Sequence, residues 1–407
     1  MRTNWAGSHV YHARGLAMPN SIEEVQSLVL RTGRLKALGS RHSFSDLADT
    51  EGFQVSLERL PRTIEVDGDV VRVPGGLRYG TLAVEMVARG LALGNLASLP
   101  HISVAGAVAT GTHGSGLHNG SLATAVRAME LVTGTGELVR LSGEDLAGAV
   151  VNVGALGIVT SLDLAVEPLY DVTQVVHEGL TWPVLLDRLE DILGAAYSVS
   201  VFTLWLGEEV GQVWVKSRGE VPEIPGAHPA GEQRHMISGM AIENTTPQLG
   251  VPGPWHERLP HFRMGFLPSA GEELQSEYLV PLSRAREALV AVRGLGEAMA
   301  DALYVAELRT VAADDLWLSG AYGEDALAIH FTWRRDSVRV GTLAARLEQR
   351  LLPLGARPHW GKVFGATAAE LAPLYPRWSD FLELAQRFDP DGRFRNAWTE
   401  RHLGLAP

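Results

Sequence analysis

Helical and strand-like spacings of apolar residues alternate along the first 168 residues. Apolar residues at positions 22, 25, 28, 29 and 30 predict a helix over residues 22–32, with Ser21 as its N-cap and Glu24 as the capping-box partner. A second helical pattern covers residues 79–88. Short strand patterns occupy residues 35–38, 70–74, 129–141 (a hairpin) and 158–166. Residues 1–168 are therefore predicted to form one α+β domain with glycine-rich loops after its strands.

The pattern changes beyond residue 168, where proline and tryptophan become more frequent and glycine-rich loops become rarer. Helical and strand patterns alternate at residues 281–295, 304–311, 326–333 and 338–352. A polar, Pro- and Gly-rich stretch at residues 220–231 predicts a long surface loop. We expect a second α+β domain over residues 169–364 and a separate C-terminal segment, residues 365–407.

Composition and charge exclude several classes of function. Of 407 residues 46% are hydrophobic, which suffices for large cores and rules out a disordered chain. The net charge of −12 makes nucleic acid and anionic membrane surfaces poor partners. The absence of cysteine excludes disulfides, thiolate nucleophiles and Cys-type metal sites. Redox chemistry would need a bound organic cofactor or a His/carboxylate metal. With no signal-peptide pattern and no apolar run of 18 residues, we expect a cytoplasmic protein, which we take to be a monomer.

Two glycine-rich loops are candidates for binding a diphosphate, at residues 39–43 and 103–116. Neither fits the Rossmann or P-loop pattern, but tight turns with exposed N–H groups and small hydroxyl side chains suit a diphosphate. Both could equally be turns without a ligand. His42 in the first loop is open to three interpretations, namely a histidine bonded to the backbone, a nucleophile toward an electrophilic cofactor, or a metal ligand. The metal interpretation is the weakest, since His101, His113 and His118 show no known ligand spacing, and we predict no metal.

The second domain offers a polar face on two predicted strands. Residues two apart share a face of a strand, so Glu307 lies beside Arg309, and His330 beside Thr332. Each pair could be a surface contact, but apolar flanks on both strands also fit the lining of a cavity. Lys362 is one of only three lysines in a chain that otherwise uses arginine, which suggests that a compact ammonium is required there.

Several ordered motifs carry a resemblance that spans nearly the whole chain. They are NWAG (4–7), GSRHS (39–43), LASLPHISVAG (96–106), GTHG (111–114), GVPGPWHER (250–258), ELRTVAAD (307–314) and HWGK (359–362). The chain resembles vanillyl-alcohol-oxidase-type FAD enzymes, in the branch of sugar-lactone and alditol oxidases. The resemblance implies a two-domain α+β flavoprotein. Its N-terminal FAD-binding (PCMH-type) domain would be followed by an α+β substrate domain, and the C-terminal segment would return to the first domain.

The resemblance also implies the cofactor and its contacts. FAD would be held covalently through His42. The residues implied to border FAD are Ala37, Leu38, Gly39, Ser40, Arg41, His42, Ser43, Ser98, Ser103, Gly106, Ala107, Val108, Ala109, Thr110, Ile158 (through its backbone) and His359. Arg41 is a departure, since the resembling enzyme type has glycine there, and we expect it to affect loop geometry or phosphate contact.

On the substrate side the resemblance implies oxidation of the terminal hydroxyl of an alditol such as xylitol or sorbitol to the aldose, with O₂ reduced to hydrogen peroxide. The implied polyol-binding residues are Ser98, Glu307, Arg309, Thr332 and Lys362, with His330 beside them. These residue types suit a neutral substrate with many hydroxyls. As base we predict His330, with Lys362 as the alternative, while Glu307 and Arg309 orient the substrate. An aldonolactone oxidase of the same branch and an FAD-binding module without turnover are the competing hypotheses.

Overall fold

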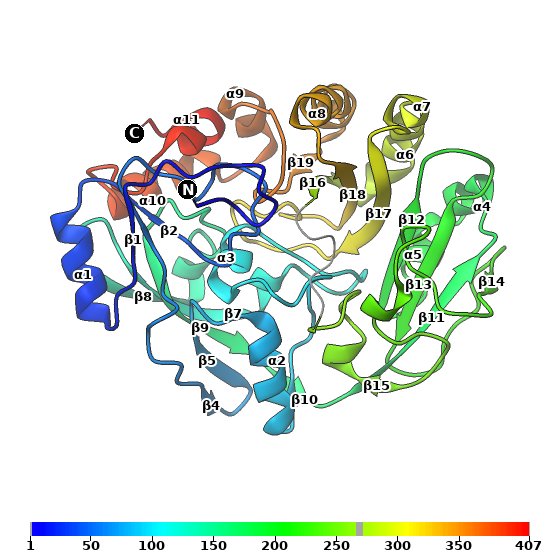
Figure 1. Cartoon of the computed structure of the whole chain (residues 1–407), viewed down its shortest axis with the longest axis horizontal. Coiled ribbons are helices and arrows are strands. Elements are labelled where there is room, and N and C mark those ends of the chain that lie inside the picture. The colour runs from blue at the N-terminus through cyan, green and yellow to red at the C-terminus, as the bar shows by residue number, and fades with distance from the viewer. Residues whose placement is uncertain (1, 266–271, 407) are drawn as a thin grey trace.

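Two antiparallel sheets, one from each half of the chain, organise the molecule (Figure 1). The computed structural model describes residues 2–265 and 272–406. Within these residues the first sheet has five strands in the order β4 (Glu65–Asp67), β5 (Val70–Pro74), β9 (Ile158–Ala165), β7 (Val126–Val132) and β8 (Leu138–Ser142). The predicted hairpin over residues 129–141 is confirmed as the antiparallel pair β7 and β8.

A small parallel sheet and three helices complete the N-terminal half. The sheet has the order β1 (Gly15–Ala17), β3 (Phe53–Val55), β2 (Leu35–Ala37), and the helices are α1 (Ile22–Arg31), α2 (Tyr79–Ala88) and α3 (Val104–Ala109). The two-residue strands β6 (Leu91–Ala92) and β10 (Glu167–Pro168) pair with each other in an antiparallel arrangement. Helix α1 matches the prediction, and the Ser21 side chain accepts from the Glu24 N–H. The Glu24 carboxylate, however, accepts from the N–H of Asn20 rather than that of Ser21.

One sequence prediction in this half is wrong in part. The stretch 103–116 is not loop throughout, because residues Val104–Ala109 form helix α3. Five of its six residues are alanine or valine, and the single glycine, Gly106, faces a close neighbour: a Cβ there would lie 2.7 Å from Ser103 Oγ. Burial of Val104, Ala107 and Val108 in the core stabilises this short helix despite the glycine.

The second half of the chain builds the larger sheet. Among the described residues its strands run β14 (His228–Pro229), β11 (Asp171–Glu178), β13 (Gly211–Ser217), β12 (Ser198–Thr203), β17 (Leu303–Val311), β18 (Ala326–Arg334), β16 (Glu273–Pro281) and β19 (Arg357–Pro358), with β15 (Gly253–Pro254) beside β11. Helices of this half are α4 (Trp182–Asp187), α5 (Leu189–Leu193), α6 (Ala285–Arg293), α7 (Gly296–Met299) and α8 (Ser337–Leu351). Helices α6 and α8 stand side by side in Figure 1 and bury their apolar stripes in one core with the sheet. Both predicted helices and both predicted strands of this half are confirmed, and the predicted loop 220–231 holds only the short β14.

The C-terminal helices return to the first half. They are α9 (Ala368–Leu371), α10 (Trp378–Phe388) and α11 (Ala397–Leu403), and their apolar side chains share a core with the five-stranded sheet. The Asn396 side chain donates to the backbone oxygens of Asp46, Leu47 and Asp49, and both chain ends lie on the same side of the molecule (Figure 1). The domain limits at residues 168/169 and 364/365 stay a proposal. The first lies just before β11 of the larger sheet, and the second lies between β19 and the C-terminal helix α9.

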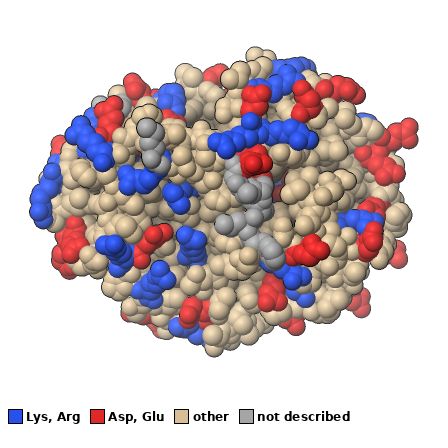
Figure 2. All heavy atoms as spheres, in the orientation of Figure 1, with Lys and Arg blue, Asp and Glu red and all other residues tan. Residues whose placement is uncertain are grey.

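On the face shown in Figure 2, acidic and basic side chains are interspersed. In the described part of the chain no helix has the length and apolar character needed to cross a membrane.

Candidate active site

One large cavity lies between the two halves and is lined by residues from both. It holds about 2150 Å³ of empty space, its open mouth included. All the predicted substrate-side residues line it: Ser98, Glu307, Arg309, His330, Thr332 and Lys362. The predicted cofactor residues that line it are Ala37, Leu38, Gly39, Ser40, Arg41, His42, Ser43, Ser98, Ser103, Gly106, Ala107, Ala109, Thr110 and His359. The fold therefore brings the glycine loops of the first half and the polar strands of the second half to one space.

Two predicted cofactor residues are not in the cavity lining. Val108 and Ile158 are almost completely buried in apolar cores, because Val108 lies on the inner face of α3 and Ile158 begins β9. The chain neighbours Gly157 and Val159 line the cavity instead. The Val108 side chain therefore does not line the cavity, and the backbone contact predicted for Ile158 stays a prediction, because the residues on either side of it line the cavity.

The two glycine loops are joined by paired serines. The Ser103 N–H donates to Ser40 Oγ (3.0 Å), and the Ser40 N–H donates to Ser103 Oγ (3.3 Å). Gly39 permits this approach, since a Cβ there would lie 2.3 Å from Ser103 Oγ. Arg41 has a φ of 66°, in the left-handed region that glycine occupies without cost. The loop thus keeps a glycine-like turn with an arginine in it, and the Arg41 carbonyl accepts from the Trp5 N–H (2.8 Å).

His42 faces the cavity with an unusual environment. Its Nδ1 and Nε2 are both buried and have no hydrogen-bond partner among the described residues. The Trp5 ring stacks on the imidazole, with ring centroids 5.3 Å apart and planes inclined by 25°. Burial, with the charges of His101 and Arg78, lowers the pKa of His42 to about 4. The imidazole is therefore neutral at pH 7 and has a nitrogen lone pair free to form a bond.

Register between strands assembles the opposite, polar wall. Glu307 on β17, His330 on β18 and Glu277 on β16 are directly paired across the sheet and form one row. Glu277 is only 1% exposed, and its Oε1 accepts from Arg309 Nη2 (2.5 Å) while its Oε2 lies 2.7 Å from Lys362 Nζ. Burial would raise the pKa of Glu277, but the charges of Lys362 and Arg309 hold it well below its usual range. No motif or spacing in the sequence marks this central carboxylate, because only the strand register places it beside the other residues.

Lys362 and His330 form a close pair. Lys362 Nζ lies 2.6 Å from His330 Nδ1, and His330 Nε2 lies 3.1 Å from Thr332 Oγ1. Burial and the Lys362 charge lower the pKa of His330 to about 4. Burial also lowers the pKa of Lys362, although Glu277 opposes that shift. At neutral pH the imidazole is unprotonated beside an ammonium that loses its proton more readily than an exposed lysine does.

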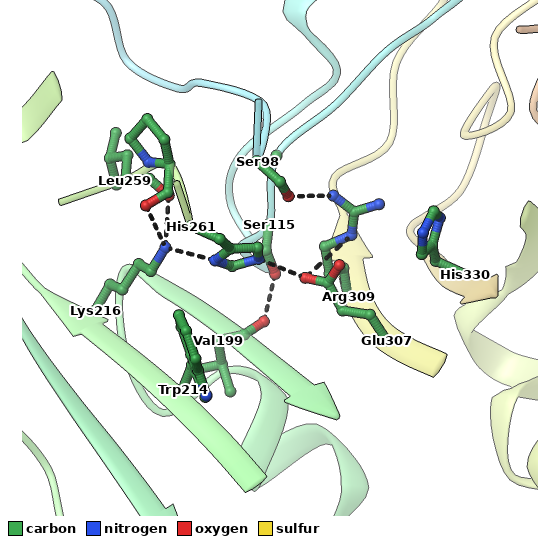
Figure 3. A network of polar contacts seen from close by, with 12 residues as sticks. Ser98, Ser115, Val199, Trp214, Lys216, Leu259, His261, Glu307, Arg309 and His330 are labelled. Carbon is green, nitrogen blue, oxygen red and sulfur yellow. Dashed lines mark hydrogen bonds and ion pairs between the residues drawn. The ribbon is translucent and has the colours of Figure 1, made fainter. Parts of the chain in front are cut away.

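A buried chain of contacts connects Glu307 through His261 to Lys216 (Figure 3). His261 Nε2 lies 2.7 Å from Glu307 Oε1, and Lys216 Nζ lies 3.0 Å from His261 Nδ1. Lys216 also donates to the backbone oxygen of Leu259 (2.5 Å). An ammonium that donates to Nδ1 leaves the proton of neutral His261 on Nε2, from which it is donated to Glu307. The pKa of Glu307, which burial alone would raise, is held well below its usual value by Arg309 and His261.

The contacts of Arg309 connect the two walls. Its Nη1 donates to Ser98 Oγ (3.3 Å), and its Nε lies 3.6 Å from Glu307 Oε1. The exposed ion-pair interpretation of Glu307 and Arg309 is wrong, since each is only 5% exposed. His359 also reaches the cavity, and its Nδ1 accepts from the Gly361 N–H (3.1 Å).

Sequence reasoning missed Glu277 and His261. Lys216 is one of the three lysines in the chain, and this scarcity is the one sequence feature that points to it. His113 lies 3.4 Å from Glu277 Oε1 and so belongs to the polar wall.

Comparison with known proteins gives consistent results over both halves. A family model described as "FAD binding domain" matches residues 13–142, and one described as D-arabinono-1,4-lactone oxidase matches residues 271–402. Alditol oxidase from a Streptomyces species is 48% identical over 405 residues, which cover 97% of each chain. L-gulono-1,4-lactone dehydrogenase from Mycobacterium tuberculosis is 28% identical over 430 residues, and the aligned region covers 99% of each chain. A solved structure of cholesterol oxidase from B. sterolicum shares the fold, with a TM-score of 0.79 at 14% identity, covering 100% of this chain and 96% of that one.

Proposed function

Since this chain belongs to the family of FAD-dependent oxidases that includes alditol oxidase, we propose that it oxidises the terminal hydroxyl of alditols to the aldose and reduces O₂ to hydrogen peroxide. The predicted two-domain FAD-oxidase fold is confirmed by these comparisons. Location in the cytoplasm and a monomeric state stay predictions from the sequence.

The observation that carries the proposal is the polar wall opposite the glycine loops. Its charged groups are buried and paired with one another, so the wall as a whole offers donors and acceptors rather than an excess of either sign. Glu307 accepts, Arg309 and Lys362 donate, and Thr332 and Ser98 can do either. Such a wall suits an uncharged substrate with several hydroxyls and disfavours one that leaves these groups unpaired.

The glycine-loop side of the cavity fits FAD. Its tight serine-linked turns suit a diphosphate, and the partnerless nitrogens of His42 provide an attachment point in the same space. Bound FAD would supply the acceptor for the hydride of the substrate carbon and the route of its electrons to O₂. We propose that His42 holds it covalently, with residues 39–43 and the start of α3 around the diphosphate.

The substrate hydroxyl must also lose a proton, and the His330 and Lys362 pair can take it. When Lys362 is unprotonated, His330 carries its proton on Nδ1, and its Nε2 is free to accept a proton from the substrate hydroxyl. Thr332 Oγ1 lies 3.1 Å from this Nε2. As Nε2 accepts the proton, Nδ1 can release its own to Lys362 Nζ at 2.6 Å. The resulting ammonium lies 2.7 Å from the Glu277 carboxylate, which stabilises it. In this assignment His330 and Lys362, which the sequence offered as alternative bases, act together as one base.

A peroxide assay over a substrate panel tests the proposal. We expect turnover with xylitol and sorbitol and much lower kcat/KM with aldonolactones, because the wall is matched to an open-chain polyol. A higher kcat/KM with L-gulono-1,4-lactone would assign the chain to the lactone oxidases instead.

Replacement of Arg309 should weaken substrate recognition. Arg309→Ala removes the donor shared by Ser98 and Glu277, so we expect kcat/KM for sorbitol to fall by roughly 10- to 150-fold, which corresponds to about 1.5–3 kcal/mol for a charged hydrogen bond. Bound flavin per chain and the thermal unfolding midpoint, measured alongside, separate this loss from misfolding. Unchanged kinetics in a folded, flavin-loaded variant would exclude Arg309 from substrate binding.

A further inference from the structure

Outside the cavity, two histidines from the N-terminal segment meet an aspartate from the loop after His42. His9 Nε2 lies 2.9 Å and His12 Nδ1 lies 2.7 Å from Asp49 Oδ2, and the three atoms lie within 4.8 Å of one another. We propose that His9, His12 and Asp49 bind one divalent transition-metal ion, with Zn²⁺ as the preferred probe. The sequence predicted no metal site, because the third ligand is 37 residues from His12 along the chain.

The ligand atoms are held in place by other bonds. Asp49 Oδ1 accepts from the N–H groups of His12 and Thr50, both at 2.8 Å, so that Oδ2 is the oxygen left to face the imidazoles. The backbone of His9 is fixed twice by Asn4, whose N–H donates to the His9 oxygen (3.0 Å) and whose Oδ1 accepts from the His9 N–H (3.1 Å). A site arranged before binding loses less conformational entropy when the ion arrives.

Ligand type and access favour a transition metal. Two imidazole nitrogens and a carboxylate oxygen form a ligand set that suits Zn²⁺ and its neighbours. The His12 side chain is 75% exposed, so water can complete the coordination shell and the ring can move. Asp46 and Glu51 are near enough for their charges to act on His12, and they would favour a cation. Ligand atoms around zinc lie about 3.3 Å apart, as follows from bonds of about 2.0 Å, so only small shifts of Asp49 and His12 are needed.

The position of the cluster gives the ion a structural consequence. It would join the segment of residues 3–12 to the loop of residues 44–50. The same N-terminal segment carries Trp5, which stacks on His42 and whose N–H donates to the Arg41 oxygen. Asn4 Nδ2 also donates to the Ser43 oxygen (3.0 Å). A bound ion would therefore fasten the segment that covers the His42 loop.

Metal titration of the FAD-loaded protein tests the site. After treatment with a chelator, we expect isothermal titration with ZnCl₂ to show one equivalent bound with micromolar or tighter affinity. Co²⁺ should give visible absorption bands from nitrogen and oxygen ligands, recorded as a difference against the flavin spectrum. Zn²⁺ should also raise the thermal unfolding midpoint, because it binds the folded chain.

Matched variants identify the ligands. His12→Gln alters an exposed side chain and should weaken Zn²⁺ binding at least tenfold without unfolding the protein, and Asp49→Asn should do the same. His118→Gln, at an exposed histidine outside the cluster, should bind Zn²⁺ as the unmodified protein does. Equal Zn²⁺ affinity in the unmodified protein and His12→Gln, or no binding by the unmodified protein, would overturn the proposal and leave a hydrogen-bonded His–Asp–His cluster.

Discussion

Replacing His42 with alanine should release the flavin from the polypeptide completely. His42 lies in the cavity with both ring nitrogens unpartnered, and the chain has no cysteine that could supply a second attachment. After acid precipitation the yellow colour of the unmodified protein should stay in the pellet. In His42→Ala it should move to the supernatant, because any flavin that still binds does so without a covalent bond.

His118→Ala serves as the control, since it removes an exposed histidine that is not part of the cavity lining. Its pellet should remain yellow. A colourless pellet from the unmodified protein would contradict covalent attachment, and a yellow pellet from His42→Ala would place the bond at another residue.

Loss of Lys362 should nearly abolish reduction of the flavin by polyol. In Lys362→Met the proton released by His330 has no acceptor and Glu277 loses the ammonium that lies 2.7 Å from its Oε2, so we expect the anaerobic reduction rate to fall roughly 100-fold or more, the usual contribution of a general base. Lys362→Arg should be nearly as slow, because a guanidinium keeps its proton and is wider than the ammonium. Stopped-flow absorbance without oxygen measures this step directly.

The pH dependence separates the proton role from a purely electrostatic one. In the unmodified protein the reduction rate should rise with pH, because the base must be unprotonated and burial lowers the pKa of Lys362 from its ordinary value. Lys362→Met should lose that rise. A near-normal rate in Lys362→Arg would show that positive charge alone is required, and a near-normal rate in Lys362→Met would remove Lys362 from the mechanism.

Regular periodicity explains which parts of the fold could be predicted from the sequence. Helices α1 and α8 each have a single apolar face, which fixes the element and its approximate ends, and the β7–β8 hairpin could be predicted from its two apolar stretches on either side of the glycine turn at residues 133–136. Helix α3 was missed because glycine and serine around it suggested a loop, whereas tertiary burial of its valines and alanines decides its conformation.

In the site too, the sequence predicts local relations between residues but not the contacts that arise from tertiary structure. Glu307 with Arg309, and His330 with Thr332, could be paired from the sequence because residues two apart on one strand share a face. Glu277 could not be placed, since its position beside His330 depends on the register between β16 and β18. The chain from Lys216 through His261 to Glu307 likewise joins segments whose contact arises only in the folded molecule.

The absorption spectrum of the purified protein before and after addition of xylitol without oxygen tests the central claim most directly. An FAD-dependent alditol oxidase should show a flavin spectrum whose visible band bleaches with xylitol and returns, with formation of hydrogen peroxide, when oxygen is admitted. A flavin spectrum that xylitol and sorbitol leave unchanged would contradict the account and indicate an FAD-binding protein with another substrate or none.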